Sequence, residues 1–531
     1  MSSPNITNII VVMLENRSYD NVLGWLYNSG NQPPYNQAPS GQSGLNGLTG
    51  SESNPNPNPP PATITVSNAT ATTVPEYDPG ELFSDMAQQI FGLSSPATSN
   101  PWTSPPPTDP GMQGFTTNYS DQTGHLKVPQ ANYPDVMTYL SPAQVPVSAW
   151  LANNFAVCDQ WFASVPCQTF TNRVFALCAA PGVSEVGLLA PYSMVDDMQY
   201  LLSNPSVKNS MTELASMFSI LDTAFPPGKN NTPNWKVYFH DYCIAMLTVP
   251  YVYDAAISSS NANIATFDNT DWGNNTPAPF GTSLGAVPAT FLDDLTNGTL
   301  PKVAFIEPRY SSNVATYSLP PNSNHPGNSE VTLIPDEPGT PIDVANGEAF
   351  LMQLYNAIQS SSIWNSCLLI ITYDEHGGTY DHVPPPPATP PGTAYGNIAI
   401  PAANNLADPA ADGFNFNYFG GRVPAIVVSP LITAGSTITP LGSVPFDHTS
   451  IIATVWDCFG LSSVAASLTS RDANAPNLMP FLTGTNSTGQ YDGPGLAAAQ
   501  AQPSKIALLK TPEEAKALLR ARLLKSAGEQ T

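Results

Sequence analysis

The segment 368–378 constrains the fold most, because an unbroken apolar run ends there in acidic residues. Leu368 to Thr372 are all apolar or β-branched, which is typical of a strand buried on both faces of a parallel sheet. Asp374 and Glu375 follow almost at once, and an unpaired buried carboxylate is strongly disfavoured. We therefore expect both acids at the carboxyl edge of the sheet, where open α/β sheets bind their ligands.

Runs of the same kind alternate with helical segments along the whole chain. The first run, 8–14, also ends in polar residues, Glu15 and Asn16. This alternation predicts an α/β fold, a three-layer α/β/α sandwich with a mostly parallel sheet. Further strands are expected within 235–241, 302–310 and 422–432, and helices within 81–91, 170–181, 211–225, 345–363 and 446–461.

Residues 28–130 differ in composition from the rest of the chain and are expected to form a loop-rich insertion. The chain contains 57 Pro, and Pro/Asn-rich segments such as NPNPNPPPATIT cannot form a helix or a central strand. Length alone would allow about two to four domains. The continuous alternation instead favours a single catalytic domain, 1–500, with the insertion capping its site.

The last segment, 501–531, is set apart by its basic charge and is expected to be a helical tail. Thr511 and Pro512 are typical of a helix start, and leucines at 518, 519 and 523 form an apolar stripe. Two interpretations stay open: a helix docked on the acidic body, or a basic amphipathic contact with a membrane or partner. The basic residues are Lys505, Lys510, Lys516, Arg520, Arg522 and Lys525.

The charge balance restricts the partners of this chain. Asp and Glu number 40 against 16 Lys and Arg, which gives a net charge of −24. Nucleic-acid binding depends on cationic contacts with phosphates, and anionic membrane surfaces repel an acidic chain. We therefore expect no nucleic-acid partner. Because no run of about 18 apolar residues occurs, we expect no transmembrane segment either.

The amino terminus lacks the basic region and the long apolar core of a signal peptide. This indicates a cytoplasmic protein, or a secreted or periplasmic one whose leader was removed. The 6 Cys are too few for a disulfide scaffold, although disulfides among Cys158, Cys167 and Cys178 stay open. Nothing in the sequence indicates the oligomeric state.

Several polar residues lie at helix starts, where they can act together with the polar strand ends. Thr169 lies in a turn before a helix, with Asn172 and Arg173 in the first helical turn. Oxygen donors that follow strands suit a divalent cation, and a hydroxyl beside that cation can attack as a nucleophile. The helix N-terminus can bind phosphate. His325 and His448, in loops ahead of helices, can protonate a leaving group.

Taken singly, each of these residues has a simpler interpretation. An Asp-Glu pair after a strand is usually an acidic turn at the surface. A lone His is usually a surface residue or a core residue with satisfied hydrogen bonds. Only the combination of strand-end oxygens, a helix-start hydroxyl and His side chains favours a site.

Segments spread over most of the chain outside the insertion and the tail resemble one family of phosphoesterases. This family includes bacterial acid phosphatases of the AcpA type and the non-haemolytic phospholipases C, and it belongs to the alkaline-phosphatase-like superfamily. The segments are MLENRSYDNVLG at 13–24, CDQWFASVPCQTFTNRVF at 158–175, WKVYFHD at 235–241, FIEPRY at 305–310, His-Pro at 325–326, TYDEHGGTYDHVPPP at 372–386, FGGRVPAIVVSP at 419–430 and FDHTSIIATVWDCFGL at 446–461.

The resemblance implies a metal-dependent phosphoric ester hydrolase of the phospholipase C or acid phosphatase type. Thr169 would be its nucleophile and would form a phosphothreonyl intermediate. One divalent ion is implied, with Ca, Mg or Mn favoured by oxygen ligands and Zn or Fe still open. The implied metal ligands are Glu15, Asn16, Thr169, Asp374 and Glu375; His240 and His325 would contact the phosphate or its leaving group; and Asn172, Arg173, Glu81 and His448 would bind the substrate.

The chain departs from the family pattern before the first predicted helix. Where the family commonly has Asp-Pro-x-His, this chain has Asp78-Pro79-Gly80-Glu81. A Glu at that position would repel a doubly charged phosphate monoester, and it could favour diesters, act as an acid or signal reduced activity. The usual Gly-Pro after Ser-Val-Pro is also replaced, by Cys167-Gln168.

The expected partner is therefore a phosphoester, either a phospholipid or a small phosphate ester. Nothing in this sequence matches the large carboxy-terminal extension of the phospholipases C, which weakens the transfer of their substrate. The alternative, from another functional class, is a non-catalytic binding or surface protein on the same scaffold.

Overall fold

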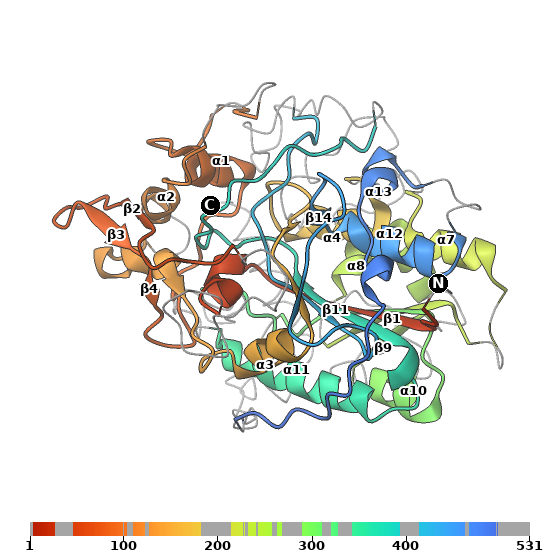
Figure 1. Cartoon of the computed structure of the whole chain (residues 1–531). Helices are drawn as coiled ribbons and strands as arrows, with labels where there is room; N and C mark the ends of the chain where they lie inside the picture. Colours follow the sequence, from red (N-terminus) through yellow and green to blue (C-terminus); the bar gives the residue numbers. More distant parts are fainter. Residues whose placement is uncertain are drawn as a thin grey trace, which may run out of the picture.

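The computed structural model describes residues 4–26, 46–98, 100–102, 110–122, 127–181, 214–226, 228, 232–240, 243–257, 263–267, 289–310, 320–327, 342–392, 414–461, 467–494 and 496. Its centre is an 8-stranded sheet with the order β13-β6-β12-β11-β1-β10-β8-β9 (Figure 1). The strands are β1 (Asn8–Leu14), β6 (Ala156–Cys158), β8 (Trp235–Phe239), β9 (Ile264–Thr266), β10 (Val303–Ile306), β11 (Cys367–Tyr373), β12 (Ala425–Val428) and β13 (Ser436–Ile438).

The direction of the strands confirms the prediction of a mostly parallel sheet. Neighbouring strands run parallel except at β12, which is antiparallel to both β11 and β6. The sequence predicted a buried strand at 422–432 but not its direction, because an apolar run looks the same in either orientation.

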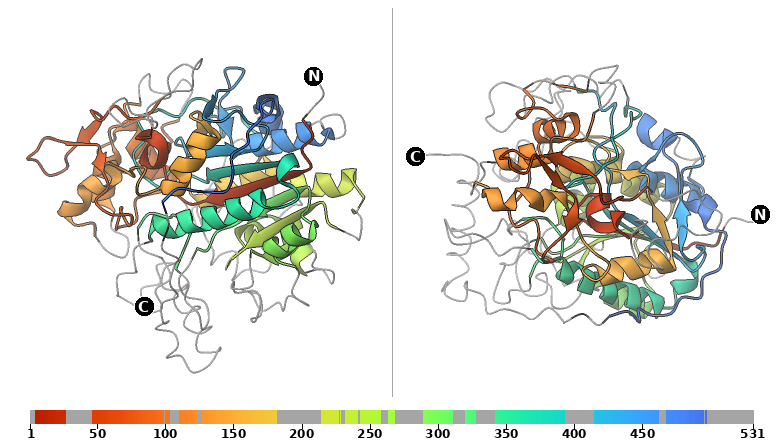
Figure 2. Two further views of the ribbon diagram at one scale, coloured as in Figure 1. Left: turned by 60° about the horizontal axis from the view of Figure 1, so that its bottom comes forward. Right: turned by 60° about the vertical axis from the view of Figure 1, so that its left-hand side comes forward.

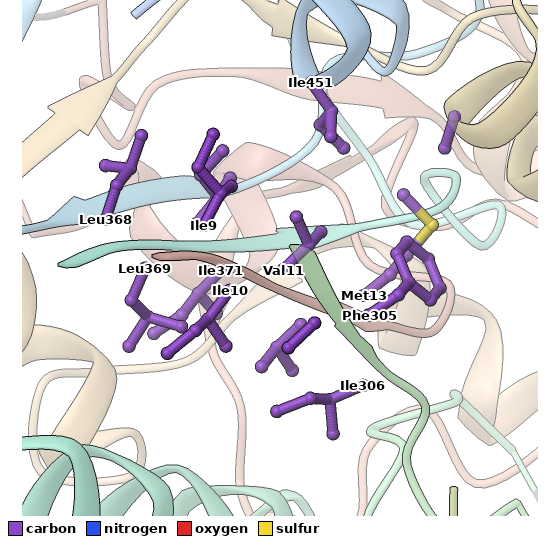
Figure 3. Close-up of a cluster of buried hydrophobic side chains, with 14 of the residues drawn as sticks. Ile9, Ile10, Val11, Met13, Phe305, Ile306, Leu368, Leu369, Ile371 and Ile451 are labelled. Atoms are coloured by element: carbon purple, nitrogen blue, oxygen red, sulfur yellow. The ribbon is translucent and has the colours of Figure 1, made fainter. Parts of the chain in front are cut away.

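The two central strands, β1 and β11, explain why their sequences do not alternate. They pair in parallel from Asn8 opposite Cys367 to Leu14 opposite Tyr373, and every residue of both strands is buried. Their side chains leave the sheet on both faces, as Figure 3 shows for Ile9 and Ile10. Both faces therefore need apolar residues.

Helices cover both faces of the sheet, which confirms the three-layer sandwich (Figures 1 and 2). The helices α3 and α11 lie on one face, and α4 and α12 lie on the other. The helix bounds are α3 (Pro146–Asn154), α4 (Thr169–Cys178), α7 (Met217–Ala224), α8 (Ile244–Thr248), α9 (Pro250–Ile257), α10 (Phe291–Asn297), α11 (Val344–Gln359), α12 (Thr449–Cys458) and α13 (Ser470–Asn474). A π-helical segment lies at Asp20–Gly24, and 3₁₀ helices lie at Gln130–Met137, Trp364–Ser366 and Met479–Phe481.

The described part of the predicted insertion packs around a second hydrophobic cluster. The insertion contains the helices α1 (Phe83–Phe91) and α2 (Phe115–Asp121), and the antiparallel strands β2 (Ser53–Pro55) and β3 (Thr63–Thr65). A short strand, β4 (Ser67–Asn68), pairs with β5 (Thr138–Tyr139). Side chains from α1, α2 and the segment after 413 share this cluster, among them Phe83, Phe115 and Phe414. In Figure 1 these elements lie at the opposite end of the sheet from the N-terminus.

Three further expectations can be compared with the described residues. Cys158, Cys167 and Cys178 are free thiols, so the disulfides left open among them are not formed. Among the described residues, no helix has both the length and the apolar character needed to cross a membrane. The predicted basic tail, 501–531, lies outside the described residues.

Candidate active site

The ends of β1 and β11 bring together two pairs of polar residues that lie far apart in the sequence. Since the strands are parallel neighbours, Glu15 and Asn16 emerge beside Asp374 and Glu375. The backbone N–H of Asn16 donates to Asp374 Oδ1 at 3.0 Å, and the same oxygen accepts from the Glu375 N–H at 2.8 Å. Glu375 Oε2 accepts from the N–H of Gly377 at 2.7 Å.

Close backbone packing holds these strand ends together. Asn16 adopts φ 57°, a left-handed conformation that Asn tolerates better than most residues. A Cβ at Gly377 would lie 1.9 Å from the carbonyl oxygen of Asn16. Only glycine therefore permits this approach, which explains the Gly that follows the acidic pair.

Thr169 is the first residue of α4 and contacts the end of β1 through Asn16. Its Oγ1 donates to Asn16 Oδ1 at 3.2 Å, and the side chain is buried. The preceding turn is held by Asn172, whose Oδ1 accepts from the Val165 N–H at 3.0 Å and whose Nδ2 donates to the Cys167 carbonyl at 2.8 Å. Asn172, a predicted substrate-binding residue, thus holds the turn that carries Thr169.

Arg173 lies one turn further along α4 and pairs with the metal-ligand candidate Asp374. Its Nε donates to Asp374 Oδ2 at 2.9 Å. Its Nη2 donates to the carbonyls of Met13 and Leu14 at 3.1 and 3.2 Å. Its Nη1 is buried and has no hydrogen-bond partner among the described residues. Arg173 therefore links α4 to the ends of both central strands, while its Nη1 group makes no hydrogen bond to the described residues.

We call Glu15, Asn16, Thr169, Asp374 and Glu375 the oxygen cluster. Burial raises the pKa of Glu15 to about 8, the charge of Asp374 adds to this rise, and His325 and Arg173 oppose it. Burial therefore disfavours the ionised form of Glu15, and a cation bound beside it would favour that form. Its carboxylate, amide and hydroxyl oxygens are the donors that hard divalent cations prefer. The residues present fit such an ion.

Glu81 and His325 lie against this cluster. Glu81 Oε1 accepts from Asn16 Nδ2 at 2.6 Å and lies 3.6 Å from His325 Nε2. His325 Nδ1 lies 2.6 Å from the Pro326 carbonyl and 3.9 Å from Asp78 Oδ1. The structure thus places both predicted residues at the site, in a group with Asp78.

The ligand atoms of Asp78, Glu81 and His325 lie within 4.8 Å of one another, as do those of Asp20, Asp381 and His382. These are the described groups in which at least three His, Cys, Asp or Glu side chains come so close. The carboxylates of Glu15, Asp374 and Glu375 are not such a group. Any ion between them would also need the amide and hydroxyl oxygens of the cluster.

His240 and His448 are both buried but have different partners. His240 follows β8, stacks on Phe267 at 4.8 Å between ring centroids, and its Nδ1 lies 2.9 Å from the carbonyl of Glu307. His448 is fully buried: Nε2 lies 2.6 Å from the Asp374 carbonyl and Nδ1 lies 3.3 Å from Trp161 Nε1. Since both nitrogens of His448 contact protein groups, its position suits support of the Asp374 backbone. Burial lowers the pKa of His448 to about 4.

His376 supports the site through the insertion. Its Nε2 lies 2.8 Å from Gln89 Oε1, and burial lowers the pKa of its ring to about 4. Gln89 in turn donates through Nε2 to the Gly80 carbonyl at 2.7 Å. No role for Gln89 could be predicted, because nothing in a helical pattern marks a side chain that bridges two distant loops.

A second polar group, which was not predicted from the sequence, contains Asp20, Asp381, His382 and Arg422; we call it the arginine cluster. Arg422 Nη2 lies 3.0 Å from Asp20 Oδ1 and 3.2 Å from Asp381 Oδ1. His382 Nδ1 lies 2.6 Å from Asp20 Oδ2. The two Tyr-Asp pairs at 19–20 and 380–381 and the Gly-Gly-Arg at 420–422 were the available signals.

Comparison with known proteins identifies the family of this chain. The family model described as "Phosphoesterase family" matches residues 6–462. The chain is 32% identical over 480 residues to non-specific phospholipase C6 of Arabidopsis thaliana, covering 88% of this chain and 70% of that protein. It is 29% identical over 472 residues to non-specific phospholipase C1 of the same plant, covering 88% and 69%.

A bacterial relative and a solved structure are also similar. Phospholipase C B of Mycobacterium tuberculosis is 25% identical over 464 residues, covering 86% of this chain and 74% of that protein. A protein in the alkaline phosphatase superfamily from Vibrio parahaemolyticus is 12% identical, covers 72% of this chain and 80% of that chain, and has a TM-score of 0.28. On the match over residues 6–462 and the identity to the plant proteins, the chain belongs to the phosphoesterase family.

Proposed function

We propose that this chain hydrolyses phosphoric esters with Thr169 as the nucleophile, beside one divalent cation held by the oxygen cluster. The observation that carries the proposal is the position of Thr169 Oγ1, 3.2 Å from Asn16 Oδ1 at the start of α4. The hydroxyl, the strand-end oxygens and the helix N-terminus meet there. A cation bound by these oxygens would polarise the phosphoryl group and lower the pKa of the Thr169 hydroxyl.

The reaction would proceed in two displacements. Thr169 Oγ1 attacks phosphorus and releases its proton to solvent, and the bond from phosphorus to the leaving alcohol breaks as that alcohol gains a proton. Water then attacks the phosphothreonyl phosphorus, which releases the phosphate product and restores the hydroxyl. The backbone N–H groups at the start of α4 would stabilise the charge on the phosphoryl oxygens.

The remaining candidate residues receive supporting roles in this scheme. His325, which lies beside Glu81, is proposed to protonate the leaving alcohol. His240, at the carboxyl end of β8, would contact the phosphoryl group from the far side. Asn172 and His448 would hold Thr169 and Asp374 in place, because their hydrogen bonds go to the turn at 165–168 and to the Asp374 carbonyl. Residues 1–500 would act as one catalytic unit with the insertion as its cap.

The relatives suggest the class of substrate. They are named phospholipases C in a plant and in a bacterium, and we propose a phospholipid or a small phosphate ester as the substrate of this chain.

Thr169→Ala tests the nucleophile. We expect turnover of p-nitrophenyl phosphate and of a phosphocholine diester to fall by at least about 1,000-fold, because the covalent route is lost. Thr169→Ser is the matched control and should keep measurable activity, since it retains a hydroxyl. Circular dichroism should be unchanged in both variants. Full activity in the Ala variant would remove Thr169 from the mechanism.

A chelator series tests the dependence on metal. Activity should disappear on chelation and return on adding Mg²⁺, Ca²⁺ or Mn²⁺. If the folded, metal-loaded protein turns over neither ester, the alternative of a non-catalytic binding protein is favoured.

A further inference from the structure

We propose that Gln89 of α1 is a positioning residue for the oxygen cluster. It holds His376 in the tautomer that carries its proton on Nε2, so that His376 Nδ1 does not donate to Glu375. This inference rests on the proposed function, because Glu375 belongs to the residues that would hold the cation. It links the predicted insertion, which contains Gln89, to the chemistry of the site.

The hydrogen-bond partners of Gln89 fix the direction of its amide. Gln89 Nε2 donates to the Gly80 carbonyl at 2.7 Å and to Asn118 Oδ1 at 2.8 Å. A backbone carbonyl can only accept a hydrogen bond, so the amide nitrogen must lie on that side. The amide oxygen therefore points the other way, where Gln89 Oε1 lies 2.8 Å from His376 Nε2. Because an amide oxygen can only accept as well, His376 Nε2 carries the proton.

Asn118 of α2 supports the same direction through different partners. Its Nδ2 donates to Asp85 Oδ1 at 2.8 Å and to Gln88 Oε1 at 2.7 Å. This leaves Asn118 Oδ1 as the acceptor for Gln89 Nε2. The side chains of this network are buried, and in a buried network the reversal of one hydrogen bond would leave other polar groups without partners. The direction of the whole chain of bonds is therefore set before it reaches His376.

The ring of His376 is held between close neighbours. A Cβ at Gly421 would lie 2.6 Å from His376 Cγ and 2.8 Å from His376 Nδ1, so the backbone of Gly421 packs directly on this edge of the ring. The ring of Phe115 meets it edge to face, with the centroids 6.0 Å apart. Turning the ring over would take Nε2 away from Gln89. Burial of this kind also disfavours the charged form, in which both nitrogens carry protons.

The tautomer decides what His376 presents to Glu375. His376 Nδ1 lies 3.5 Å from Glu375 Oε2 and makes no hydrogen bond to the described residues. With the proton on Nε2, this nitrogen presents a lone pair, whereas the other tautomer would donate an N–H to the carboxylate. Glu375 Oε2 already accepts from Gly377 at 2.7 Å, and a second donor would compete with a cation for the same oxygen. Groups behind metal ligands act in this way, by setting the basicity and orientation of the ligands.

NMR of the full chain labelled with ¹⁵N-histidine tests the tautomer directly. The chain contains 6 His, and the signals of His376 are identified by their loss in His376→Leu. In wild type, the nitrogen shifts should show a proton on Nε2 and none on Nδ1, both in chelator and in saturating Mg²⁺. Gln89→Met fills a similar volume without an acceptor, so the tautomer with Nδ1 protonated should become populated in chelator. A proton on Nδ1 in wild type, alone or together with one on Nε2, would contradict the inference.

Metal binding measures the consequence for the oxygen cluster. Calorimetry with Mn²⁺ gives the Kd of the full chain, and Gln89→Met should weaken binding by about tenfold. Gln88→Met is the matched control, because the same change is made on the same helix to a side chain that bonds Asp121 and Asn118 instead of His376. Its Kd should stay within about twofold of the wild-type value.

A double variant separates the tautomer from a structural role of Gln89. Gln89→Met also removes the bond to the Gly80 carbonyl, and a loosened loop would weaken the metal site in any background. In His376→Leu no imidazole remains to donate to Glu375, so adding Gln89→Met should weaken Mn²⁺ binding by less than about twofold. An equal loss in both backgrounds, or an unchanged tautomer in Gln89→Met, would overturn the inference. If wild type binds no Mn²⁺ while the tautomer still changes, the proposed metal site fails and the control of His376 by Gln89 is supported.

Discussion

The oxygen cluster and the arginine cluster use the same kinds of residue but balance their charges differently. In the arginine cluster, Arg422 lies between Asp20 and Asp381. Burial alone would lower the pKa of Arg422, but these carboxylates and the Tyr19 ring outweigh burial and raise it. Arg422 therefore supplies this cluster with a cation from the protein, although burial still raises the pKa of Asp381 to about 6.

In the oxygen cluster, Arg173 forms an ion pair with Asp374, and Glu15 is left with a pKa raised to about 8, chiefly by burial. A buried carboxyl group whose ionised form is disfavoured would gain from an added cation, whereas carboxylates that are already paired with a protein cation can serve as a structural element. Acidic residues near a strand end therefore do not identify a metal site until their cationic neighbours are known.

Removing the cation from the arginine cluster should have the largest effect on stability. Arg422→Met leaves Asp20 and Asp381 buried without it, and we expect the free energy of unfolding to fall by about 3 to 5 kcal/mol. Urea unfolding measures this loss, which should be the same with Mg²⁺ and with chelator.

Arg173→Met is the matched control for this comparison. Its loss of stability should be smaller in saturating Mg²⁺ than in chelator, because a bound divalent cation compensates Asp374. If Mg²⁺ reduces the loss in Arg422→Met equally, the arginine cluster also binds metal and the distinction fails.

Glu348 provides a buried carboxylate of a third kind, which is held by the start of α3. It accepts from the N–H groups of Val147 and Ser148 at 2.6 and 2.9 Å and from Ser148 Oγ. Burial raises its pKa from 4.5 to about 7. The folded protein then binds more protons than the unfolded chain between these values, so stability from this group falls as pH rises from 4.5 to 7.

The expected change is about 3 kcal/mol at most. It is measured as the difference in the free energy of unfolding between wild type and Glu348→Gln, which does not titrate, at pH 4.5 and pH 7. The wild type should lose stability relative to the variant across this window. A difference that stays constant with pH would show that hydrogen bonds from α3 keep Glu348 ionised.

Metal should stabilise the protein through the oxygen cluster alone. At about 100 times its Kd, a cation that binds only the folded state adds about 2.7 kcal/mol to the free energy of unfolding. Asp374→Asn should abolish this gain, and His382→Gln, in the arginine cluster, should keep it. Thermal unfolding with and without Mg²⁺ measures both. The opposite pattern would assign the metal to the arginine cluster.

Local patterns determined much of the architecture from the sequence alone. The runs at 8–14 and 367–373 are apolar without alternation because both of their faces are buried, and a pattern of that kind can be read directly. The polar residues after them had to lie at the carboxyl edge, since parallel strands end there together. The start of α4 at Thr169 likewise agrees with the turn predicted before it.

Only the tertiary structure decided which partners these side chains have. It brought Glu81, from the insertion, to Asn16. It directed the Asn172 side chain toward the preceding loop, which that side chain holds by hydrogen bonds. It also placed Arg422 between Asp20 and Asp381, two acidic residues that follow a Tyr just as Asp374 in the oxygen cluster does. The physical reason is that charge balance and hydrogen bonding depend on distances between segments hundreds of residues apart. The periodicity of a sequence indicates which face of a helix or strand is buried, but it does not indicate which charged side chain from another segment lies against that face.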